Sequence, residues 1–169
     1  KDENGNPYGI SKYVGQEMSN PLAYIATRQG NFDWGDNLVG NTFFELEPIK
    51  GLRFKSDIGG KMSFWGGESF TPVSYLNASS YTANNAFSKN SNKGFTWNFE
   101  NTLSYSKTIL DHDFTLLAGT SAFVDQSQGI GFTKRNLPVN NFDEASMNYD
   151  ATHDNIDGYG WESAPHKVS

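Results

Sequence analysis

The sequence contains no cysteine, which excludes disulfide bonds, thiolate catalysis and zinc–thiolate sites. It also lacks a basic cluster, because the 13 Lys and Arg residues are dispersed and 19 Asp and Glu residues give a formal net charge of -6. A nucleic-acid-binding protein needs a basic stripe to displace counterions from phosphates. We therefore expect no nucleic-acid partner.

Long hydrophobic runs are also missing. No stretch approaches the ~18 apolar residues of a membrane helix, so any membrane role must come from strands. The first residues, KDENGNPYGI, are charged and turn-forming, and we expect no signal peptide in them. Only 36% of the chain is hydrophobic, yet 15% is aromatic and Gly occurs 17 times. This composition favours a sheet protein with long polar loops.

The clearest pattern is a strict alternation over residues 52–64, within a strand expected at about 52–65. A period of two with no charge on one side and no large apolar residue on the other is typical of a strand with one dry and one wet face. The apolar side consists of even-numbered residues: Leu52, Phe54, Ser56, Ile58, Gly60, Met62 and Phe64. The polar side consists of odd-numbered residues: Arg53, Lys55, Asp57, Gly59, Lys61 and Ser63.

Three further strands are expected, at about 36–47, 95–105 and 114–124. Between the first two strands, PIKG (residues 48–51) predicts a tight turn in which Gly51 takes a positive φ. Residues 1–35 are expected to form a loop, and the Ser-rich and Asn-rich segments 66–94 and 125–169 are expected to form long loops.

Short and long connections alternate along the chain, which is typical of transmembrane β-barrels and uncommon in compact soluble domains. Aromatic residues at both strand ends are consistent with interfacial girdles: Phe64, Trp65, Phe95 and Trp97 at one end, Tyr105 and Phe114 at the other. Thirteen residues tilted by ~40° cover roughly 33 Å, enough for an apolar band of ~25 Å. The predicted fold is all-β, with antiparallel strands forming part of a transmembrane β-barrel wall with long extracellular loops.

Two segments resemble the barrel region of SusC/RagA-type TonB-linked outer-membrane transporters. They are NPLAYIATRQGNFDWGDNLVGNTFFELEPIKGLRFKSDIGG and WNFENTLSYSKTILDHDFTLLAGTSA, and they lie within residues 20–125. The residues that carry the resemblance are Asn20-Pro21, Gly40-Asn41, Pro48-Ile49-Lys50-Gly51-Leu52, Glu100-Asn101-Thr102-Leu103-Ser104-Tyr105 and Leu117-Ala118-Gly119.

The resemblance implies a large closed barrel with an internal plug, located in the cell outer membrane. Such a barrel imports glycans or peptides with energy from TonB, contacts outer-membrane lipid, and is capped by a SusD-type surface lipoprotein. This chain lacks a plug, a TonB-contacting segment and most of the strands. We therefore expect residues 1–169 to be an internal portion of a longer chain.

No catalytic, cofactor-binding or metal site is expected, and we do not expect an enzyme. The sequences DHD (111–113) and HDNID (153–157) contain acid–base and metal-ligand residue types, but they lack the spacing of a regular element, so we interpret them as solvated turns. Glu45, Glu47 and Glu100 are expected to line a wet lumen beside Arg53 and Lys55 rather than to act as glycosidase carboxylates.

A second function class remains open, a soluble secreted β-sandwich that binds carbohydrate. Aromatic faces stack on sugar rings in either class. The long loops are expected to contact cargo or a capping lipoprotein. The candidate contact residues are Trp34, Trp65, Tyr75 and Tyr81.

Overall fold

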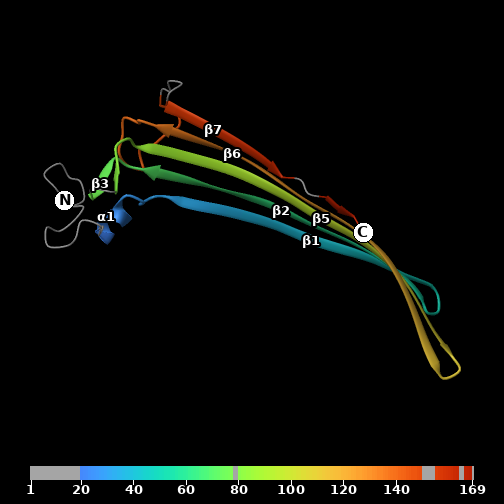
Figure 1. The fold of residues 1–169 in the computed structure, drawn as a ribbon. Helices are drawn as coiled ribbons and strands as arrows, with labels where there is room; N and C mark the ends of the chain where they lie inside the picture. The colour runs from blue at the N-terminus through green and yellow to red at the C-terminus, as the bar shows by residue number, and fades with distance from the viewer. Residues whose placement is uncertain (1–19, 78–79, 150–154, 164–165, 169) are drawn as a thin grey trace. The chain divides into compact units, whose positions relative to one another are not determined.

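The computed structural model describes residues 20–77, 80–149, 155–163 and 166–168. Its largest element is a six-stranded sheet with the order β1-β2-β5-β6-β7, in which β8 also pairs with β6 (Figure 1). A separate two-stranded hairpin pairs β3 with β4. The elements are α1 (Pro21–Ala26), β1 (Phe32–Ile49), β2 (Leu52–Thr71), β3 (Ser74–Asn77), β4 (Ser80–Thr82), β5 (Ala86–Ile109), β6 (His112–Arg135), β7 (Ile156–Ser163) and β8 (His166–Val168).

The described residues include no helix that is both long and apolar enough to cross a membrane.

The helix α1 lies where the sequence predicted only loop. The Asn20 side chain caps it by accepting a hydrogen bond from the Leu22 N–H at 3.0 Å, and Pro21 occupies the first turn, where its missing N–H costs nothing. The loop prediction for 1–35 is therefore wrong for this helix and for the start of β1 at Phe32, while residues 1–19 lie outside the described residues.

The four main strands contain the predicted spans and run further. The segment 66–94, expected to be a loop, holds the end of β2, the hairpin β3–β4 and the start of β5. The segment 125–169 likewise holds the end of β6 and the strands β7 and β8. The loop interpretation failed because Ser and Asn side chains bond across strands here: Ser88 and Thr133 hydroxyls are 2.8 Å apart, and the Asn92 amide donates to the Trp65 carbonyl at 3.2 Å.

Both short connections are tight turns, and the sequence predicted the one at residues 48–51. Gly51 has a φ of +86°, so the predicted positive φ is confirmed. The Ser106 N–H donates to the Gly51 carbonyl at 2.8 Å, so this turn lies against β5. The turn between β5 and β6 places Leu110 at a φ of +56°, and the Thr108 hydroxyl donates to Asp113 at 2.6 Å across it.

The chain divides into two compact units. The first unit contains residues 1–34, 66–91 and 130–160, and the second contains 35–65, 92–129 and 161–169. A small core of Phe70, Phe87 and Leu137 lies in the first unit. The buried Asn85 holds residues 137–139 over this core, because its amide accepts from the Leu137 N–H at 2.7 Å and donates to the carbonyls of Leu137 and Val139.

The second unit is a sheet with a polar face and an apolar face. On the polar face Arg53 lies 3.2 Å from Glu45 and 3.8 Å from Glu47, and Lys55 lies 2.8 Å from Asp57. The odd-numbered positions of β2 therefore share one face with acidic residues of β1, which confirms the predicted alternation.

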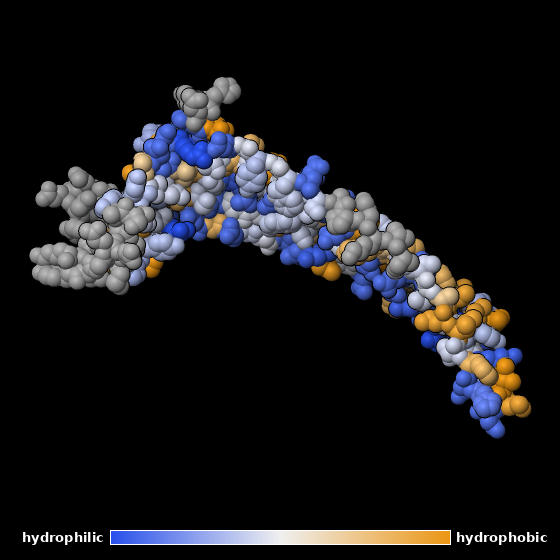
Figure 2. Space-filling view, viewed as in Figure 1, coloured by the Kyte–Doolittle hydropathy of each residue, from blue (hydrophilic) through white to orange (hydrophobic). Residues whose placement is uncertain are grey.

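The apolar face carries large side chains that remain exposed (Figure 2, orange toward the hairpin turns). These include Leu38, Phe44, Leu46, Ile58, Met62, Phe64, Phe95, Phe99, Leu103, Tyr105, Phe114 and Leu116. A β-sandwich would bury such a face against a second sheet of similar size. The described strands form one six-stranded sheet and one small hairpin, so the structure does not supply that second sheet.

Candidate functional site

Two tryptophans meet on the polar face of the second unit. Trp65 comes from β2 and Trp161 from β7, and their ring centroids are 6.3 Å apart with an interplanar angle of 42°. The strands β5 and β6 separate β2 from β7 in the sheet, and each carries a glycine near one ring. A Cβ at Gly94 would lie 3.3 Å from the Trp65 ring, and one at Gly129 would lie 2.6 Å from Trp161 Nε1. The glycines thus leave the room that the two indoles occupy.

A hollow of about 410 Å³ lies on the same face beside Trp65. The Ser63 hydroxyl donates to Asn37 Oδ1 at 2.8 Å, and the Thr96 hydroxyl donates to Asp125 Oδ1 at 3.1 Å. The lining side chains are mostly neutral hydrogen-bonding groups with one cation and one anion: Asn37, Lys61, Ser63, Trp65, Thr96, Asp125 and Ser127.

An aromatic surface next to hydrogen-bonding groups can bind a polar ligand that also has an apolar face. Sugar rings and peptide groups both fit this description. The balance of Lys61 and Asp125 gives the hollow no strong preference for a net charge.

The four predicted contact residues do not form one cluster. Trp65 lines the hollow in the second unit, whereas Trp34 belongs to the first unit, where a Cβ at Gly66 would lie 2.8 Å from its ring. Tyr75 and Tyr81 are register partners across the hairpin β3–β4 and are 61% and 63% exposed. The binding role of all four stays a prediction.

Trp161 was not among the contact residues predicted from the sequence, because the whole segment 125–169 was interpreted as loop. A signal was present in GYGW (158–161), where glycine and aromatic residues alternate with the period of a strand. Glycines opposite aromatic rings are a known way of pinning strand pairs in sheets.

The acidic motifs show no catalytic arrangement. Glu45 and Glu47 contact Arg53, and Asp113 closes the β5–β6 turn with Thr108. Within the described residues, no group of three His, Cys, Asp or Glu side chains is placed to hold a metal ion. The HDNID motif falls partly outside them, at residues 153–154.

A single antiparallel sheet of long strands, mostly apolar on one face and mostly polar on the other, is the fold of a β-barrel wall. Comparison with solved structures supports this fold. The chain is similar to a chain in the structure of the RagAB peptide importer in the "open-open" state, with a TM-score of 0.75 and 16% identity over 98% of this chain and 18% of that chain.

Two further structures match in the same way. The structure of the RagAB peptide transporter gives a TM-score of 0.73 and 18% identity, covering 96% of this chain and 18% of that one. The structure of the RagAB peptide importer in the "closed-closed" state gives a TM-score of 0.72 and 17% identity, covering 89% of this chain and 16% of that one. This chain thus spans less than a fifth of those chains. No protein-family model matches the sequence, and neither does any curated protein.

Proposed function

We propose that this chain is part of the wall of an outer-membrane, TonB-dependent importer of the SusC/RagA type. The apolar face of the sheet is the observation that carries this proposal. On β1 it extends from Leu38 to Pro48, ten residues apart, and on β5 from Phe95 to Tyr105, also ten residues apart. At ~3.3 Å per residue and a tilt of ~40°, this distance corresponds to a depth of about 25 Å, the height of the apolar band on membrane barrels.

In this assignment the exposed apolar side chains meet lipid, and the opposite face lines the water-filled interior. The ion pairs of Arg53 and Lys55 are on that opposite face, where water solvates them. A hydrocarbon environment would penalise the same charges by several kcal/mol in total, at ~2 to 4 kcal/mol for each cation near the midplane. The charge distribution therefore favours the orientation in which the charged face lines the water-filled interior and the apolar face meets lipid.

The hollow beside Trp65, whose ring contacts Trp161, then faces the interior, where cargo passes. We propose that it contacts imported glycans or peptides, and that the hairpin with Tyr75 and Tyr81 contacts a SusD-type lipoprotein. The RagAB structures, titled as a peptide importer and transporter, support this assignment through their fold. TonB would act on parts of the protein outside this chain.

Membrane fractionation tests the proposal. We expect the protein that contains this chain to remain with outer membranes through salt and alkaline washes and to be released by detergent alone. Salt removes electrostatically bound peripheral proteins, so it provides the internal control. Recovery of the protein as a freely soluble monomer would contradict the importer proposal and favour a secreted carbohydrate-binding module.

A further inference from the structure

The segment that follows β6 in the first unit folds back over the small core, and we call its residues 137–149 the strap. The Phe142 ring of the strap stands edge-on to the rings of Phe32 and Phe87, with centroids 6.2 and 6.0 Å apart. The strap thus packs on the core through most of its length. Its apolar side chains in or against the core are Leu137, Val139, Phe142, Ala145, Met147 and Tyr149.

Two asparagine side chains fasten the strap to the rest of the unit. The Asn85 amide binds backbone groups at the beginning of the strap. The Asn140 amide, which belongs to the strap, accepts from the Val73 N–H at 2.7 Å and donates to the Val73 carbonyl at 3.2 Å. Because Val73 immediately precedes β3, the strap also fixes the start of the hairpin that carries Tyr75 and Tyr81.

A buried positive charge contacts the strap. Lys134, near the end of β6, is only 2% exposed, and its ammonium donates to the Met147 carbonyl at 3.3 Å. Within the described residues, no carboxylate forms an ion pair with this ammonium. An ammonium can donate three hydrogen bonds, and removing it from water without an anionic partner costs free energy. The closed strap therefore carries an opposing contribution that an apolar side chain of similar length would not have.

We propose that the strap is a releasable cover, held closed by ring packing and asparagine hydrogen bonds and opposed by the buried charge of Lys134. In the closed state the strap covers Phe70 and Phe87 and fixes Val73. In the open state the ammonium regains water, both rings become exposed, and the hairpin β3–β4 loses its link to Asn140. Release of the strap does not depend on the importer assignment; only its effect on a partner that contacts the hairpin rests on the proposed function.

Hydrogen–deuterium exchange of the purified full-length protein, read by mass spectrometry with peptide fragmentation, tests the proposal. The reporter is the Leu137 N–H, which donates to Asn85 Oδ1 at 2.7 Å and exchanges only when the strap opens. We expect it to exchange faster than amides in the interior of β5. Lys134→Met should slow its exchange about tenfold, because an apolar side chain of similar length removes the buried charge that opposes closure.

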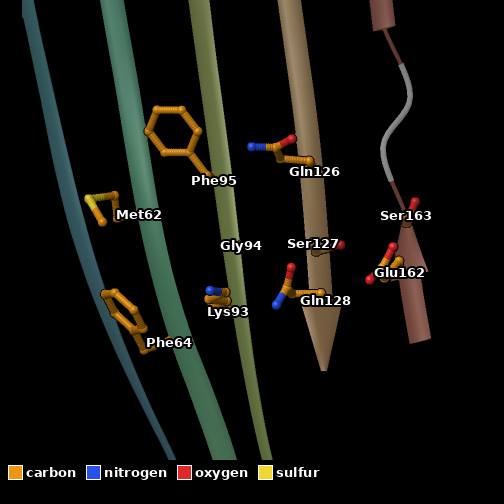
Figure 3. A pocket seen from close by; sticks show the side chains of 10 residues that line it. All are labelled: Met62, Phe64, Lys93, Gly94, Phe95, Gln126, Ser127, Gln128, Glu162 and Ser163. Atoms are coloured by element: carbon orange, nitrogen blue, oxygen red, sulfur yellow. The ribbon is translucent and has the colours of Figure 1, made fainter. Parts of the chain in front are cut away.

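Asn140→Ala should have the opposite effect. Asn140 is exposed, so the variant should fold, and losing both hydrogen bonds to Val73 should speed exchange of the Leu137 N–H about tenfold. Lys93→Met is the matched control. Lys93 is an exposed lysine of β5 in the second unit, where it lines a pocket of about 360 Å³ together with Phe95 (Figure 3). This variant should leave exchange of the Leu137 N–H unchanged.

Unchanged or faster exchange in Lys134→Met would overturn the opposing role of Lys134, since loss of a simple anchor speeds opening. An equal slowing in Lys93→Met would do the same. Exchange in the unmodified protein as slow as in the interior of β5 would overturn release itself. None of these outcomes depends on membrane fractionation, so failure of the strap proposal is distinguishable from failure of the importer proposal.

Discussion

Replacing Ile58 by arginine is the most direct test of which face meets lipid. Ile58 lies six residues after Leu52 and six before Phe64, and it is 50% exposed on the apolar face. Six residues at ~3.3 Å and ~40° of tilt correspond to about 15 Å of depth on either side. Ile58 therefore lies near the middle of the proposed apolar band.

An arginine at the bilayer midplane makes folding into lipid less favourable by ~2 to 4 kcal/mol, so it lowers the free energy of unfolding by that amount. Thr102→Arg is the matched control, because Thr102 has the same strand parity on β5 as Thr96 and Ser106, whose hydroxyls bond across the polar face. An arginine there would be solvated, so its effect should stay below ~1 kcal/mol.

The assay is reversible folding into lipid bilayers, with the free energy of unfolding read from urea titrations of both variants. An equal change for Ile58→Arg and Thr102→Arg would refute a lipid-facing Ile58. A loss of stability for Ile58→Arg in a protein that folds without lipid would place Ile58 in the core of a soluble protein, which also excludes charge.

Three further predictions concern the turn, the core and the tryptophan pair. Gly51→Ala should destabilise the folded protein by at least ~1 to 2 kcal/mol in urea titrations, because φ is +86° and the new Cβ would meet the Ser106 carbonyl. Asn85→Ala should leave buried backbone groups of Leu137 unpaired, at a cost of ~2 to 4 kcal/mol, and limited proteolysis should then cleave residues 137–149 faster. Trp161→Ala should weaken cargo binding about fivefold or more with assembly unchanged, since stacking on one ring contributes ~1 to 3 kcal/mol. Unchanged affinity in calorimetry would show that the tryptophan pair does not contact cargo.

The interiors of the strands were predictable from local sequence. Alternation between residues 52 and 64 identifies two faces without any tertiary information, because side chains on a strand point to opposite sides in turn. The turn at Gly51 was equally readable, since a glycine after a proline-containing segment satisfies a positive φ.

The strand ends were not predictable in the same way. Ser and Asn are typical of loops when considered one at a time, yet Ser88 and Asn92 lie in β5 because partners on neighbouring strands satisfy their polar groups. Those partners are distant in sequence, so no local window contains them. The helix α1 was missed for a different reason, because six residues carry too little periodicity to outweigh the surrounding Asn and Gly.

The sequence by itself determined that the chain forms amphipathic strands with two distinct faces, because a period of two is a property of each strand alone. The tertiary structure decided which side chains meet across the sheet. Trp65 and Trp161 come together only because β5 and β6 lie between β2 and β7 and present glycines under the two rings. The pairing order and register of the strands depend on residues that are distant in sequence, and they bring separate aromatic residues together on one surface.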